Sequence, residues 1–248
     1  GIHSLLWSLD SWFENRKQKI ELSSLKVVFY KPIRVGSEVS LSMKSNHKKH
    51  VIIELSHGKS ILMKIEFAWK KLEERENDYF KMYFPKKLDP TIVLEDEIED
   101  KVGNLDLYLN IEAASKMFPN LIEYFSPLQI SIILGTTRLV GTECPGLNSV
   151  YLELSLLSGS SFECTTLKYE VVRYSRSTGL VTMNISAPGI TGVIKAFIRP
   201  KKREQDSYLN IKMKVNRKEF NGQCALIIGG SRGLGEVTAK LLAAGSAD

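Results

Sequence analysis

One pattern occurs twice along this sequence: a helix with one apolar face, followed by four short strands. In the first copy, Ile2, Leu5, Leu6 and Leu9 have the spacing of an amphipathic helix. The second copy opens at Ser126-Pro127, a favourable pair for the start of a helix, and runs on as SPLQISIILGTTRLVG. The repetition predicts two similar folding units in one chain.

Strand-like runs follow both helices and are separated by turn-forming residues. They begin at residues 25, 38, 50 and 60 in the first copy and at residues 149, 165, 180 and 190 in the second. A further strand, NLDLYLNI, is predicted ahead of the second helix, from Asn104. Setting Ser24 against Ser149 and Phe67 against Phe197 gives offsets of 125 and 130 residues. We therefore expect one repeat over 1–70, a charged connector over 71–103, and a second repeat over 104–200.

Composition excludes several classes of protein. Of the 248 residues, 43% are hydrophobic and 25% are charged, which is typical of a globular protein. No apolar stretch is long enough to span a membrane, and no secretory signal pattern opens the chain. The three cysteines are an odd number without C-x-x-C spacing, which favours a reducing, cytoplasmic setting.

The net charge of +6 is concentrated in one segment. Residues 201–219 hold seven Lys or Arg against three acidic residues, a net charge of +4. A nucleic-acid-binding face more often spreads basic residues over one structured surface with interleaved aromatics. We therefore interpret residues 201–220 as a solvated basic linker, and we expect neither nucleic acid nor a membrane as a partner.

Three segments of the repeat resemble the MaoC-like dehydratases and R-specific enoyl hydratases. They are the opening GIHSLLWSLDSW, the strand–Pro–Gly–strand segment VVFYKPIRVGSEVSL and the closing GVIKAFIRP. The resemblance covers about residues 1–70 and 104–200. It implies an α+β double hot-dog fold, in which each of two central helices is wrapped by a curved antiparallel sheet. It also implies an acyl thioester, of CoA or of acyl carrier protein, as the partner.

The resemblance implies a place for the catalytic residues. Hydratases of this kind carry a D-x-N-P-x-H loop ahead of the central helix, whose N-terminus polarises the thioester carbonyl. In the second repeat this loop should fall within 111–126, which holds Glu112 and Glu123 but no histidine. In the first repeat the loop, like the leading strand, would lie upstream of Gly1. The catalytic residues are thus unknown; His3 is a candidate on its place in the first helical turn alone, and Asp10 fits a cleft or a solvated face equally well.

Residues 221–248 resemble the beginning of a short-chain dehydrogenase/reductase. The sequence predicts an apolar strand over Ala225–Ile228, then the turn GGSRGLG, then a helix, which is the context in which a glycine turn approaches a pyrophosphate. The family usually has Thr where Ile228 stands here. The resemblance implies that NADP or NAD would be contacted by Gly229, Ser231, Arg232, Gly233, Leu234 and Gly235. Because the family's later strands and its catalytic Ser, Tyr and Lys are absent, we do not expect this truncated Rossmann-like segment alone to bind a dinucleotide.

Three functions remain open from the sequence. The repeats could be a 3-hydroxyacyl-thioester dehydratase or enoyl hydratase of a fatty-acid or polyketide-type protein that also carries a reductase. They could instead bind or scaffold acyl thioesters without catalysis, or the activity could reside only in the reductase. The repeats themselves are expected to need no cofactor and no metal, and to be a monomer with an internal pseudo-dimer or a homodimer.

Overall fold

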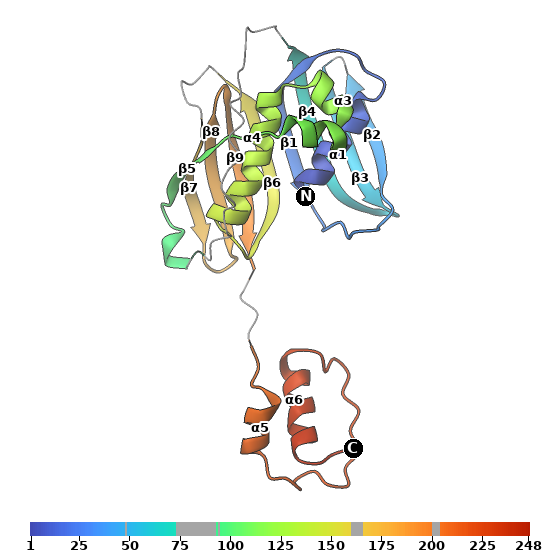
Figure 1. Cartoon of the computed structure of the whole chain (residues 1–248), viewed down its shortest axis with the longest axis vertical. Coiled ribbons are helices and arrows are strands. Elements are labelled where there is room, and N and C mark those ends of the chain that lie inside the picture. Colours follow the sequence, from blue (N-terminus) through green and yellow to red (C-terminus); the bar gives the residue numbers. More distant parts are fainter. Residues whose placement is uncertain (48, 73–92, 94, 160–165, 200–203) are drawn as a thin grey trace. The chain divides into compact units, whose positions relative to one another are not determined.

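The computed structural model describes residues 1–47, 49–72, 93, 95–159, 166–199 and 204–248 (Figure 1). The chain divides into two compact units, a first unit over 1–200 and a second unit over 201–248. Most of the predicted connector at 71–103 lies outside the described residues. The first unit is an α+β structure built on one nine-stranded antiparallel sheet.

The helices and strands of the first unit follow the predicted order. Its first half contains α1 (Ile2–Phe13), β1 (Ile20–Phe29), β2 (Ser40–His47), β3 (His50–His57) and β4 (Ser60–Lys71). Its second half contains β5 (Val102–Asp106), α2 (Ile111–Met117), α3 (Pro119–Tyr124), α4 (Pro127–Arg138), β6 (Ser149–Ser158), β7 (Thr166–Ser175), β8 (Leu180–Ala187) and β9 (Ile190–Ile198). A 3-10 turn (Glu95–Glu97) precedes β5, and a π-helical turn (Leu139–Glu143) extends α4.

The sheet joins the two halves edge to edge. Its strand order is β2-β3-β4-β1-β6-β9-β8-β7-β5, with β1 antiparallel to β6 through pairs such as Leu25 and Leu156. The orders β1-β4-β3-β2 and β6-β9-β8-β7 correspond strand for strand outward from this seam. Since β5 adds one strand beyond β7, only the second half has a strand at that place among the described residues.

Irregularities in the ladders also repeat. The pairing of β1 with β4 shifts between Leu22 and Ser24, and that of β6 with β9 shifts between Tyr151 and Glu153, 129 residues later. A second pair of shifts, in β2–β3 after Met43 and in β7–β8 after Val171, is 128 residues apart. Because a bulge adds a residue and bends its strand, matching bulges give the two halves the same local curvature.

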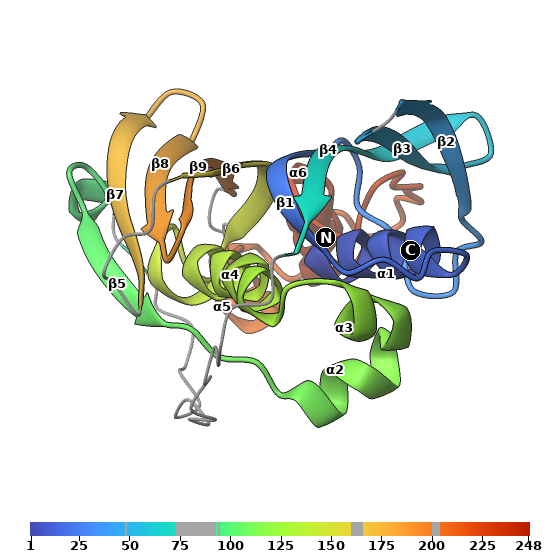
Figure 2. The same ribbon diagram turned by 90° about the horizontal axis from the view of Figure 1, so that it is seen from above.

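The two long helices cover one face of the sheet. Figure 2 shows α1 in front of the β1–β4 half and α4 in front of the β6–β9 half, on the same side. The apolar stripe of α1 is fully buried at Leu5, Leu6 and Leu9, and α4 buries Ile132 and Ile133 in the same way. Each such side chain contributes about 1.5–3 kcal/mol by leaving water. This shared core explains why the helical periodicity of both segments was visible in the sequence.

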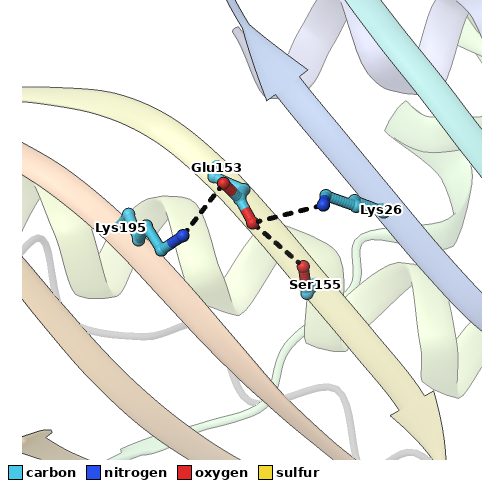
Figure 3. Close-up of polar contacts among 4 residues, drawn as sticks. All are labelled: Lys26, Glu153, Ser155 and Lys195. Atoms are coloured by element: carbon cyan, nitrogen blue, oxygen red, sulfur yellow. Dashed lines mark hydrogen bonds and ion pairs between the residues drawn. The ribbon is translucent and has the colours of Figure 1, made fainter.

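The seam carries a charged cluster on the strands (Figure 3). Glu153 on β6 accepts a hydrogen bond from Lys195 on β9 at 3.2 Å and one from Ser155 at 3.4 Å, and its carboxylate lies 4.0 Å from the Lys26 ammonium on β1. The Glu153 side chain is only 22% exposed. One carboxylate therefore connects strands of both halves.

Two strand predictions are corrected. The strand expected from Asn104 to Ile111 runs instead from Val102 to Asp106, and Asp106 pairs with Thr166 of β7. The strand expected over Ala225–Ile228 is not formed: Leu226 and Ile228 are each 90% exposed. A parallel strand needs neighbours on both sides to bury such residues, and the described residues of the second unit supply almost none.

The second unit consists of α5 (Tyr208–Lys214) and α6 (Gly233–Ala244), which pack together and bury Ile211 and Ala244. Helix α5 lies within the predicted basic linker 201–220, where no helix was expected. The Asp248 N–H donates to the Gln223 carbonyl at 2.9 Å, and the Ala225 N–H donates to the Asp248 carbonyl at 3.0 Å. Asp248 thus donates to Gln223 and accepts from Ala225, two residues further on. This is the hydrogen-bond pattern between two parallel chain segments, which here are joined by a helix. Across the part of the chain described, no helix is long and apolar enough to cross a membrane.

Candidate functional site

Most polar groups buried in the helix layer are satisfied by backbone. The hydroxyls of Ser8, Ser131 and Thr136 each donate to a carbonyl of their own helix at 2.7–2.8 Å. Such back-bonding leaves a hydroxyl with its proton already donated. These side chains therefore complete the core and are poorly placed to act as nucleophiles.

Gln129 connects α4 to the strand of the other half. Its Oε1 accepts from the Leu22 N–H at 2.7 Å, and its Nε2 donates to the Leu22 carbonyl at 3.1 Å. Leu22 lies at the bulge in β1, where a backbone group loses its regular ladder partner. The amide thus satisfies two buried backbone groups, and sequence reasoning had given this residue no role.

Asp10 is a carboxylate at the junction of the two halves. It projects from α1, half-buried, and accepts from the Leu121 N–H at 2.8 Å and from Asn120 Nδ2 at 3.3 Å. Both donors belong to α3, which leads into α4. Asp10 therefore lies between α1 and α3 and not on a solvated face, which was one of the two places expected for it.

His3 does not pair with Asp10. The two residues are seven positions apart on α1, or about 10 Å along a helix, which is too far for a hydrogen bond. His3 is exposed, and its ring packs edge to face on Phe118 with the ring centres 5.3 Å apart. His3 thus lies near the junction, and no carboxylate in the described part of the chain pairs with it.

The segment expected to correspond to a hydratase loop, 111–126, forms α2 and α3. Glu112 is exposed and pairs with Lys116 one helical turn later, and Glu123 is exposed on α3. Neither glutamate faces a histidine among the described residues. The remaining histidines lie on the first half, where His50 contacts Glu66 at 2.9 Å and His57 contacts the Glu38 carbonyl at 2.6 Å. No cluster of metal-binding side chains occurs within the described ranges.

The glycine turn of the second unit has the backbone that the sequence pattern requires. Gly229 and Gly233 have φ values of +83° and +61°, which side chains with a Cβ rarely adopt. A Cβ on Gly235 would collide with the Gly229 carbonyl oxygen. The turn therefore packs backbone against backbone at the start of α6. Ser231, Arg232 and Leu234 are exposed in the same turn.

Tyr208 and Lys212 have a Tyr-x-x-x-Lys spacing, like the catalytic pair of the reductase family, but lie ahead of the glycine turn. The Lys212 ammonium lies 5.8 Å from the centre of the Tyr208 ring, one turn along α5, so the two residues are a pair on the surface of a helix. Cys144 is fully buried after the π-helical turn, and burial raises the pKa of its thiol to about 11. It therefore lacks the lowered pKa of a nucleophilic cysteine.

The contrast between two thiols is directly testable. In a Cys164→Ser background, we expect iodoacetamide at pH 8 to modify the exposed Cys224 and to leave Cys144 unmodified until the first unit unfolds. Mass spectrometry of tryptic peptides, with and without denaturant, measures this. Rapid modification of Cys144 in the folded protein would contradict its assignment to the core.

No known protein family and no curated protein matches the chain in sequence. Solved structures with a similar backbone trace include the tesB protein of Mycobacterium avium subspecies paratuberculosis. Its sequence identity is 12% over 81% of this chain and 87% of that one, with a TM-score of 0.43. They also include acyl-CoA thioesterase II TesB2 of Mycobacterium marinum, at 11% identity over 83% and 91%, with a TM-score of 0.44. HtdX of Mycobacterium tuberculosis follows at 9% identity over 77% and 82%, with a TM-score of 0.39. The likeness is distant.

Proposed function

We propose that residues 1–200 are a double hot-dog unit that binds acyl thioesters, with its two halves acting as an internal pseudo-dimer. One observation carries the proposal: α1 and α4 lie on one face of a single antiparallel sheet, each across its own half, and contact each other where the halves join. The matching bulges support a duplication, and the junction brings polar groups of one half to elements of the other.

The junction has an apolar side that suits an acyl chain. Phe13 at the end of α1 stacks with Tyr124, the last residue of α3, and packs edge to face with Phe125. Phe13 and Phe125 are 1% and 2% exposed, so they belong to the core behind the proposed site, and small-ligand sites combine apolar walls of this kind with a few placed polar groups. Asp10, with the Leu121 N–H and Asn120, supplies the polar groups beside this aromatic contact.

Binding without turnover is the function these residues support best. Hydration of an enoyl thioester needs an acid or base beside the β-carbon, and a carboxylate–histidine pair is what related chemistry uses. Among the described residues, no such pair faces the junction. A dehydratase or hydratase activity is a second candidate. Asp10 alone favours it, because two donors hold the Asp10 carboxylate at the junction, where an acid or base would be needed.

Thioesters of pantetheine test the proposal, because they carry the acyl group without the nucleotide of CoA. We expect calorimetric titration to detect decanoyl-pantetheine binding and spectroscopy to detect no hydration of decenoyl-pantetheine. Turnover that is lost in Asp10→Asn while binding persists would establish the second candidate. Absence of both binding and turnover would overturn the assignment of residues 1–200 to acyl-thioester chemistry.

For the second unit, we propose that the turn from Gly229 to Gly235 is the phosphate-facing turn of an NADP- or NAD-dependent reductase. Its support is the positive φ of two glycines, the close approach at the third, and the parallel bonding of Gln223 and Ala225 to Asp248. One strand, turn and helix are a fraction of a dinucleotide site. Titration of the chain with NADPH, followed by fluorescence, is therefore expected to show no saturable binding. Saturation at micromolar NADPH would show that residues 221–248 bind the dinucleotide without further strands.

A further inference from the structure

We infer that basic residues around the C-terminal end of α1 form a binding site for the phosphate groups of CoA. The inference rests on the proposed acyl-thioester function and selects CoA over a carrier protein. The site, called here the basic corner, consists of Arg16, Lys17, Lys19, Lys49 and Lys71. It is invisible in the sequence because these residues come from three segments separated by up to 55 positions.

Backbone contacts bring the three segments together. Ile20 pairs with Lys71 where β1 begins and β4 ends, and the Leu72 N–H donates to the Lys19 carbonyl at 3.1 Å. The Trp69 N–H donates to the Lys49 carbonyl at 3.1 Å, which places the β2–β3 turn beside the end of β4. In Figure 1 these parts, the blue loop after α1 and the teal end of β4, lie at the top of the first unit.

Aromatic side chains form the floor of the basic corner. Arg16 lies over the Trp12 ring at 4.2 Å and donates to the Trp12 carbonyl, so its guanidinium is held in place. The Trp12 and Trp69 rings pack at 6.2 Å, and both indole N–H groups are buried without an acceptor in the described part of the chain. Buried donors normally have partners. The two indoles are therefore buried donors without an acceptor in the described part of the chain, and the Arg16 guanidinium lies over one of them.

The charges of the basic corner have no acidic partner in the described part of the chain. No acidic side chain described lies within ion-pair distance of any of the five, whereas the neighbouring Lys70, on the opposite face of β4, pairs with Glu21 at 2.9 Å. Glu14 is the other acidic residue of these segments. Glu73 and Glu74 follow in the sequence but lie outside the described residues. Elsewhere on the strands of the first half, Lys26 and Lys44 each have a carboxylate within 4.0 Å, whereas Lys64 has none among the described residues.

Phosphate is the anion that this arrangement fits. Several cations that converge around one fixed guanidinium suit the diphosphate and the phosphate monoester of CoA. Nucleic acid would in addition use exposed aromatic rings for stacking, whereas Trp12 is 3% exposed. Asp10 precedes Arg16 by six residues, so the corner adjoins the junction proposed to receive the acyl group.

The decisive experiment compares two ligands that share an acyl group and differ in phosphate. We expect calorimetry to give decanoyl-CoA at least about a tenfold higher affinity than decanoyl-pantetheine, a difference that shrinks in salt. The variant Lys17→Gln/Lys19→Gln/Lys49→Gln/Lys71→Gln should lose about tenfold in decanoyl-CoA affinity, since four exposed ion contacts that each contribute a little under twofold multiply to about that factor. It should bind decanoyl-pantetheine as the unchanged chain does, which also verifies its fold.

A matched variant controls for net charge. Lys31→Gln/Lys59→Gln/Lys168→Gln/Arg173→Gln removes four exposed cations outside the corner and should leave decanoyl-CoA affinity within about twofold. The phosphate site would be overturned if the four-lysine variant bound decanoyl-CoA as tightly as the unchanged chain does. It would also be overturned if the variant lost affinity for an acyl carrier protein and not for decanoyl-CoA. Failure to bind decanoyl-pantetheine would instead contradict the acyl-thioester proposal itself.

Discussion

Replacement of Gln129 by leucine is expected to lower the free energy of unfolding of the first unit by about 2–4 kcal/mol. Leucine fills most of the volume but leaves the Leu22 N–H and carbonyl without the partners that Gln129 now provides. Leu22 is 2% exposed, so water cannot replace the lost bonds. Each orphaned buried group costs about 1–3 kcal/mol.

Urea unfolding followed by circular dichroism measures this loss. Ser131→Ala is the matched control, because Ser131 is also buried on α4 but donates only within its own helix. It should change the free energy of unfolding by less than about 1 kcal/mol. If both variants lost the same free energy of unfolding, the hydrogen bonds from Gln129 to Leu22 would contribute no more to stability than a hydrogen bond within one helix.

Gly192→Ala is the second substitution with a large expected effect. Gly192 lies on β9 opposite Leu156, and a Cβ there would collide with the Ser155 carbonyl oxygen and approach the Leu156 side chain to 2.7 Å. Because the obstacle includes backbone, β6 and β9 must separate to make room. We expect a loss of about 2–3 kcal/mol, at the upper end of overpacking costs.

The thermal midpoint of Gly192→Ala should fall accordingly. Gly141→Ala serves as the control, since a Cβ at Gly141 would meet nothing within 4 Å. A Gly192→Ala protein as stable as the unchanged chain would mean that β6 and β9 tolerate displacement, contrary to their close packing.

The sequence predicted what depends on local periodicity. The apolar spacing of residues 2–13 and the alternation in β3, β4 and β9 follow from burial on one face, so these elements were correctly placed. Local periodicity does not fix where a strand ends: the strand expected from Asn104 to Ile111 runs from Val102 to Asp106. The strand over Ala225–Ile228 was wrong, and Leu226 and Ile228 are each 90% exposed.

The site depends on contacts between distant residues, which periodicity does not encode. Gln129 meets Leu22 across 107 positions, and Asp10 meets Leu121 across 111. Asn120 and Gln129 carried no motif that could have marked them. The basic corner was missed because the positive charge was counted along the chain, where residues 201–219 dominate, while its own residues gather only in three dimensions.

The joining of both halves in one chain changes what a single substitution can do. In a two-fold homodimer every change appears at two equivalent places, so a residue useful on one side must also be tolerated on the other. Here Leu22, which Gln129 bridges, corresponds at the matching bulge of the other half to Tyr151, which differs from it in size and chemistry. Each half has thus been free to diverge, and one can keep a binding role while the other is altered for packing.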